Sequence, residues 1–175
     1  MAERIIELGC GPAKTPGAFG VDIFPYQGVD RIQDLDQIPW SLPDGSFDRV
    51  IARHIIEHVE RADLFMKEVH RIAAHGALLE VVTPHYSFVH SWSDPTHRRH
   101  LSTQWYLPFL AGGYLAEQVG AFERVSSTVT FGSSVRCWIP KLMIRLRGLD
   151  RWEKHYAFVY PARDILTTLR VVKRP

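Results

Sequence analysis

The chain has 175 residues, of which 46% are apolar and 23% are charged, and its formal net charge is +2. This length and composition predict a single domain over residues 1–175, with enough apolar side chains for a sizeable core. No apolar stretch is long enough to span a bilayer, no secretory signal is recognisable, and the two cysteines make no disulfide framework, so we expect a cytoplasmic protein without membrane contact.

The charge is unevenly distributed along the chain. Residues 1–87 hold eight Lys and Arg against 13 Asp and Glu, a net charge of −5, whereas residues 88–175 have a net charge of +7. A negative half suits a cationic cofactor, and a positive half suits an acidic small-molecule substrate. A solvated surface with uneven charge explains the same numbers. Nucleic acid is not an expected partner, and the oligomeric state stays open.

The first expected element is a short buried strand, residues 5–8, which ends in a glycine turn at residues 9–11. Glycine lets the backbone turn sharply and approach a ligand closely. A second strand, residues 18–23, ends near Asp22, an acid placed to accept hydrogen bonds from both hydroxyls of a ribose. Ligands of open parallel sheets bind at the carboxyl ends of the strands, so this opening predicts half of a nucleoside site.

The connection between these two strands is unusually short. It has only about ten residues, including Pro12 and Pro16, where a parallel crossover normally needs a dozen or more with a helix. We therefore expect a truncated first crossover helix. The third glycine of a dinucleotide fingerprint is also missing, because Lys14 stands at its position.

The rest of the chain alternates apolar runs with turn signals. Further strands are expected at residues 29–35, 47–52, 77–82, 122–131 and 165–173, and helices at 62–73, 102–119 and 137–147. Gly76 is expected to stop the first of these helices, and Ser102 to cap the second.

Several motifs occur in a telling order over residues 5–60. They are Glu7-x-Gly9-x-Gly11, then Leu-Pro-Asp-Gly-Ser-Phe-Asp at residues 42–48, then His54-x-x-Glu57-His58. This series resembles small, type 11-like class I S-adenosylmethionine-dependent methyltransferases. The resemblance implies an α/β fold, with a Rossmann-like, seven-stranded, mostly parallel sheet and helices on both faces, and S-adenosylmethionine as the cofactor. It also implies that the last strand lies antiparallel between the fifth and sixth.

The resemblance assigns the cofactor site residue by residue. Asp34 would accept from the adenine amino group, the Leu35 N–H would meet a ring nitrogen, and Ile23 would pack on the adenine face. The full set of cofactor-binding residues that it implies is Glu7, Gly9, Cys10, Gly11, Asp22, Ile23, Asp34, Leu35 and His54.

Polar, aromatic and basic residues crowd the loop at residues 83–102, and a second substrate-side segment is expected at 133–162. Within the first loop, His85 and His97 are the candidates for a catalytic base. The candidates for substrate contacts are Tyr86, Arg98 and Arg99. A hydrogen-bonded loop that only packs over the site is the alternative.

We expect no metal site. His54 and His58 have the spacing of some zinc pairs, but no glutamate follows the first histidine. The loop histidines have no diagnostic spacing; they are His85, His90, His97 and His100.

The sequence therefore predicts methyl transfer from S-adenosylmethionine to a small molecule, with a base needed only if the acceptor keeps its proton. A cofactor-binding or interaction domain without catalysis is one alternative. A metal-dependent hydrolase built on the loop histidines is the other.

Overall fold

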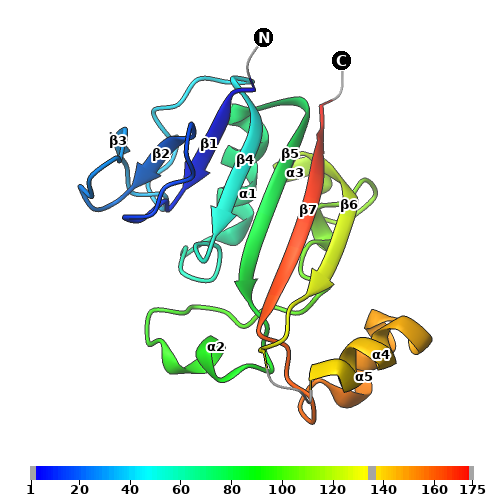
Figure 1. Cartoon of the computed structure of the whole chain (residues 1–175). Helices are drawn as coiled ribbons and strands as arrows, with labels where there is room; N and C mark the ends of the chain where they lie inside the picture. Colours follow the sequence, from blue (N-terminus) through cyan, green and yellow to red (C-terminus); the bar gives the residue numbers. More distant parts are fainter. Residues whose placement is uncertain (1–2, 134–136, 174–175) are drawn as a thin grey trace.

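The computed structural model describes residues 3–133 and 137–173, and its centre is one seven-stranded sheet (Figure 1). The strand order is β3-β2-β1-β4-β5-β7-β6; β1 to β5 run parallel, and β7 is antiparallel to both β5 and β6. This confirms the expected sheet. The strands are β1 (Ile5–Leu8), β2 (Phe19–Asp22), β3 (Arg31–Ile32), β4 (Phe47–Arg53), β5 (Ala73–Pro84), β6 (Ala121–Val129) and β7 (Asp164–Val172).

The helices divide into two groups. One group packs on the sheet, and the other lies beyond its carboxyl edge, where α2, α4 and α5 are found in Figure 1. The helices are α1 (Ala62–Ile72), α2 (Val89–Ser93), the 3-10 helix η1 (Leu107–Phe109), α3 (Ala116–Val119), α4 (Trp138–Arg147) and α5 (Leu149–Tyr156). None of the helices in the described ranges combines the length and apolar character that crossing a membrane requires.

The core lies between the sheet and the pair α1 and α3, which are drawn behind the sheet in Figure 1. The apolar side chains of α1 recur at helical spacing, and Phe65, Val69 and Ile72 are fully or almost fully buried. Asp63 in the first turn and Arg71 in the last suit the helix dipole. This packing holds β1 and β4 in place, and the site begins at their carboxyl ends.

The other face of the sheet carries ion pairs. Arg49 on β4 pairs with Glu80 on β5 at 2.8 Å, and Arg53 pairs with Glu7 on β1 at 2.5 Å. Residues 9–18, which connect β1 to β2, form turns without a helix, as the short spacing predicted. The connection from β2 to β3 also lacks a helix. Neither of these two connections therefore places a helix against the face of the sheet that carries the ion pairs.

Two expected boundaries are wrong. Residues 102–119 do not form one helix: η1 and α3 are separated by turns, because Pro108 has no N–H and Gly112 has a φ of +86°. The helix α1 already ends at Ile72, and the chain enters β5 directly, with Gly76 inside that strand at a φ of +79°.

Candidate active site

The glycine turn after β1 is held by the end of β2. The N–H groups of Gly9 and Cys10 both donate to the Val21 carbonyl, at 2.8 and 3.1 Å. Asp22 accepts from the Gly11 N–H at 2.8 Å through Oδ2 and from the Phe24 N–H at 3.0 Å through Oδ1. The carboxylate of Asp22 therefore fixes the turn and the end of β2 relative to each other.

Glu7 is occupied from within the protein. It is 2% exposed, and its Oε1 accepts from Arg53 Nε at 3.0 Å and Nη2 at 2.5 Å. Its Oε2 accepts from the Thr15 N–H at 2.6 Å. Glu7 thus links the β1–β2 connection, through Thr15, to Arg53 at the end of β4. Cys10 is buried beside it, and burial, followed by the charges of Asp22 and Glu7, raises the pKa of the Cys10 thiol.

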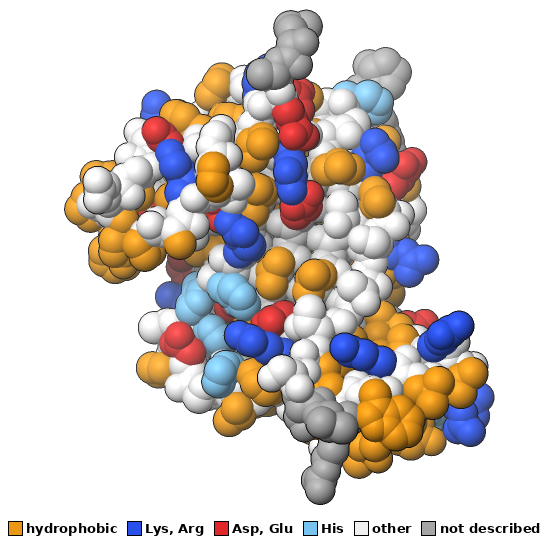
Figure 2. Space-filling view, in the orientation of Figure 1, with side chains coloured by type: hydrophobic (Ala, Val, Ile, Leu, Met, Phe, Trp, Pro, Cys, Tyr) orange, Lys and Arg blue, Asp and Glu red, His pale blue; other side chains and the backbone are white. Residues whose placement is uncertain are grey.

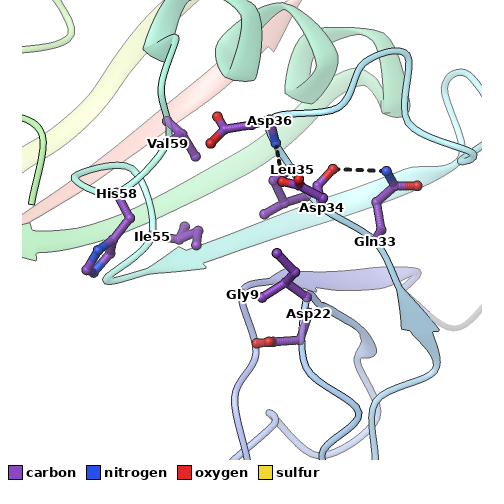
Figure 3. A pocket seen from close by; sticks show the side chains of 10 residues that line it. Gly9, Asp22, Gln33, Asp34, Leu35, Asp36, Ile55, His58 and Val59 are labelled. Atoms are coloured by element: carbon purple, nitrogen blue, oxygen red, sulfur yellow. Dashed lines mark hydrogen bonds between the residues drawn. The ribbon is translucent and has the colours of Figure 1, made fainter. Parts of the chain in front are cut away.

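A cavity of about 170 Å³ opens in front of the glycine turn. Figure 3 shows Gly9 and Asp22 on one side of it, with Leu35 and Ile55 opposite. The cavity is lined by Gly9, Asp22, Ile23, Gln33, Asp34, Leu35, Asp36, Ile55, His58 and Val59. It thus brings together five of the nine predicted cofactor residues. The remaining four, Glu7, Cys10, Gly11 and His54, do not line it.

The far wall of the cavity follows β3. Asp34 accepts from the Asp36 N–H at 2.9 Å through Oδ1 and from Gln37 Nε2 at 3.2 Å through Oδ2. The Leu35 carbonyl accepts from Trp40 Nε1 at 3.1 Å. The side chain of Leu35 packs in the hydrophobic core. Sequence reasoning missed Gln33, Asp36, Ile55, His58 and Val59 as lining residues, although their places directly after β3 and β4 were a usable signal.

A second cavity of about 330 Å³ adjoins the first, and His58 lines both. Figure 2 shows histidine side chains gathered near it, beyond the carboxyl edge of the sheet, with acidic and basic side chains beside them. It is lined by His54, Glu57, His58, Pro84, His90, Ser93, Asp94, His97, Arg163 and Asp164.

His54 lines this second cavity and directly follows β4. Its φ is +52°, uncommon for a residue with a side chain. Its Nδ1 lies 3.4 Å from Glu57 Oε1, and the interaction with that carboxylate raises the pKa of His54. His97 reaches the same cavity from the loop after α2, where its Nδ1 contacts the Ser91 carbonyl at 3.0 Å.

His85 lies elsewhere. Its side chain is 0% exposed, with Nδ1 2.7 Å from Ser87 Oγ and Nε2 2.9 Å from Glu153 Oε1. Both ring nitrogens are engaged inside the protein, so neither is free for an acceptor. Tyr86 stacks beside it and donates to the Glu153 carbonyl at 3.3 Å. The structure therefore does not bring the two predicted catalytic histidines together.

The predicted substrate arginines also bond to the protein itself. Arg98 Nε donates to the His58 carbonyl at 3.1 Å. Arg99 donates to the Ile56 carbonyl at 2.6 Å and to the Glu60 carbonyl at 2.9 Å. These bonds fasten the loop after α2 to the segment that follows β4.

A protein-family model described as "Methyltransferase domain" matches residues 2–121, more than half of the chain. The chain belongs to this family. Its cofactor is S-adenosylmethionine.

Relatives extend this picture. Ajmaline N-methyltransferase from Rauvolfia serpentina is 35% identical over 118 residues, which cover 54% of this chain and 39% of that protein. The chain thus spans well under half the length of this curated relative.

Solved structures match the fold along nearly the whole chain. A methyltransferase from Mesorhizobium loti has a TM-score of 0.63 at 16% identity, covering 97% of this chain and 91% of that one. A complex of a putative methyltransferase with the Trm112 activator from Haloferax volcanii has a TM-score of 0.63 at 15% identity, covering 98% and 83%. The [4+2]-cyclase SpnF has a TM-score of 0.62 at 16% identity, covering 99% and 76%. At such identities the likeness concerns the fold alone.

The residues of this chain fit S-adenosylmethionine. The first cavity has a carboxylate near each end, Asp22 and Asp34, and apolar walls between them. Hydroxyls and an amino group suit the carboxylates, and an adenine ring suits the apolar walls. A Cβ on Gly9 would lie 2.8 Å from Ile55 Cδ1, so the glycine keeps open the approach to the cavity. When bound, the cofactor supplies an activated methyl group.

Proposed function

We propose that the chain transfers the methyl group of S-adenosylmethionine to a small-molecule acceptor held in the second cavity. The observation that supports this most is the place of His58, which lines both cavities. A cofactor in the first cavity and an acceptor in the second would then lie on either side of one side chain. Positioning of this kind can supply much of the rate of methyl transfer.

The residues of the first cavity bind the cofactor, and those of the second bind the acceptor. Asp22, Asp34 and Ile23 hold the nucleoside, and the turn at Gly9 leaves room for it. His97 orients the acceptor and takes its proton where the acceptor has one to lose. His85 supports the loop through Glu153, and Arg98 and Arg99 position the walls of the acceptor cavity without reaching into it.

The acceptor is a small molecule, and an acidic group on it would meet Arg163. Arg163 and the histidines give this cavity positive charge, whereas Glu57, Asp94 and Asp164 give it negative charge. The name of the Rauvolfia relative states N-methylation of ajmaline, which supports a small acceptor. Shape and specific polar contacts, more than net charge, would then select it.

A cofactor-binding interaction module is the second candidate. The truncated connection between β1 and β2 favours it, since less of the chain encloses the cofactor. The Haloferax complex contains a methyltransferase bound to an activator protein.

Label transfer from methyl-labelled S-adenosylmethionine separates the two candidates. Small amines, phenols and hydroxy acids are tested as acceptors, and methylated products are detected by mass spectrometry. We expect wild-type protein to label one class, and His97→Asn to lower kcat/KM at least tenfold while S-adenosylhomocysteine affinity stays within threefold. His155→Asn, which changes an exposed histidine on α5, is the matched control and should leave both unchanged. Tight S-adenosylhomocysteine binding with no labelled small molecule would favour the interaction module.

A further inference from the structure

Three side chains with metal-binding atoms meet in the second cavity. They are Glu57, His58 and His97, and the ligand atoms of the three lie within 4.8 Å of one another. They come from two segments about 40 residues apart. The Arg98 N–H donates to the Glu57 carbonyl at 2.9 Å and Arg98 Nε to the His58 carbonyl at 3.1 Å, so Arg98 holds the two segments together independently of any ion.

The tautomer of His97 leaves one nitrogen available. Its Nδ1 lies 3.0 Å from the Ser91 carbonyl, which can only accept a hydrogen bond. Nδ1 must therefore carry the hydrogen, and in the neutral ring Nε2 has the free lone pair. Histidine ligands of metals are commonly oriented in this way, by a bond from the other ring nitrogen to a carbonyl or carboxylate.

His58 is oriented by a short chain of hydrogen bonds. Its Nδ1 lies 2.9 Å from Thr96 Oγ1, and that hydroxyl donates its hydrogen to Asp94 Oδ1 at 2.6 Å. The same Asp94 oxygen also accepts from the Thr96 N–H at 2.8 Å, so Asp94 Oδ1 acts as the acceptor in both bonds. Since the threonine hydrogen is used, His58 Nδ1 must donate to Thr96, and its Nε2 also has a free lone pair.

Glu57 supplies an oxygen that lacks a partner. Its side chain is 1% exposed, and Oε2 accepts from Thr83 Oγ1 at 3.0 Å. Oε1 finds no hydrogen bond among the described residues; the nearest basic group is His54 Nδ1, at 3.4 Å. A buried carboxylate oxygen without a bond is costly unless a cation compensates it.

We propose that Glu57 Oε1, His58 Nε2 and His97 Nε2 bind a divalent first-row transition metal cation such as Zn²⁺, Co²⁺ or Mn²⁺. Two imidazoles with one carboxylate suit these ions better than Mg²⁺ or Ca²⁺, which prefer oxygen ligands. Donor atoms around a tetrahedral ion lie roughly 3.4 Å apart, so the three groups draw together by at most about 1.4 Å on binding. Asp94 Oδ2, 3.9 Å from His97 Nε2, lies next to the site.

The location of the site suggests which group would fill the coordination positions of the cation that the three side chains leave free. The three donors line the acceptor cavity, beside the cavity that holds the nucleoside. An acceptor with a hydroxyl or carboxylate oxygen would bind the cation there directly. With the cation bound, the Nε2 lone pair of His97 is occupied, so His97 would then position the cation and would not take the acceptor's proton. This part of the inference rests on the proposed function, whereas cation binding itself does not.

Calorimetry with ZnCl₂ and the visible absorption of bound Co²⁺ test the site on chelator-treated protein without a histidine tag. We expect one cation per wild-type chain. Glu57→Gln and His97→Ala should each weaken binding at least tenfold, and Thr96→Val, which removes the partner of His58, should weaken it less. His155→Ala is the control and should bind as wild type does.

Three results would overturn the inference: no stoichiometric binding to wild-type protein, unchanged affinity in both ligand variants, or an equal loss in His155→Ala. S-adenosylhomocysteine binding and label transfer are measured on the same samples. Failure of cation binding with both of these intact rejects the metal site alone. Stoichiometric cation binding without methyl transfer rejects the proposed function and leaves the metal site standing.

Discussion

Replacing Gly9 by alanine tests how the glycine turn shapes the first cavity, where we propose that the cofactor binds. The φ of Gly9 is +65°, a region that costs a residue with a Cβ roughly 1–2 kcal/mol. The new Cβ would lie 2.8 Å from Ile55 Cδ1, and Gly9 and Ile55 both line the cavity, so Ile55 must turn within it. Gly17→Ala is the matched control, because its φ is +79° but nothing lies within 4 Å of its Cβ.

Both glycine variants should melt about 2–8 °C below wild type, since 1 kcal/mol corresponds to about 2–4 °C in a chain of this size. Only Gly9→Ala should also weaken S-adenosylhomocysteine binding, at least tenfold or about 1.4 kcal/mol. Thermal melts and calorimetry measure the two effects separately. Equal affinities in the two variants would refute the argument that Gly9 keeps the cavity open.

Two further predictions concern the support of the site. Burial raises the pKa of Glu153, but hydrogen bonds from His85 and Thr103 together have the larger effect, so the pKa in the folded state lies below the ordinary value of 4.5. The ionised carboxylate therefore stabilises the fold fully above pH 4.5, and this stabilisation is lost as the pH falls through the folded-state pKa. Glu153→Gln should therefore cost about 1.5–3 kcal/mol at pH 7, and urea unfolding below pH 5 should show a shallower pH dependence than in wild type. Arg99→Met removes two bonds to carbonyls of the neighbouring loop, so it should lower the melting temperature while S-adenosylhomocysteine affinity stays within threefold. Arg61→Met, which breaks an exposed ion pair, should change the melting temperature less, and an equal change would contradict this role for Arg99.

The parts of the fold that were predicted correctly depend on short-range signals. The strands β1 and β4 each contain a short buried stretch followed by a turn, and the glycine turn with Asp22 occupies neighbouring stretches of chain. These features repeat a family motif, which also supplied the antiparallel place of β7. Periodicity alone would not have given that strand order, because β7 lies between β6, the strand before it in the sequence, and β5, which is more distant in the sequence.

The errors arose where distant residues decide the outcome. His85 follows β5 as a catalytic loop residue would, but it is buried against Glu153, which lies 68 residues further on in α5. Apolar residues at 102–119 suggested one helix, whereas Pro108 and the glycines that follow interrupt it. The meeting of His58 and His97 depends on the bonds of Arg98 to the other loop, which sequence spacing does not reveal.

The most direct test of the account is S-adenosylhomocysteine binding by Asp22→Asn protein, with Asp48→Asn as the control. Asp22 lines the first cavity, where we propose that the nucleoside binds, whereas Asp48 pairs with Arg4 at the opposite, amino edge of the sheet. Loss of a charged hydrogen bond is worth about 1.5–3 kcal/mol, so calorimetry should show affinity falling roughly ten- to hundredfold in Asp22→Asn and unchanged in Asp48→Asn. Wild-type affinity in a folded Asp22→Asn protein would contradict the placement of the cofactor.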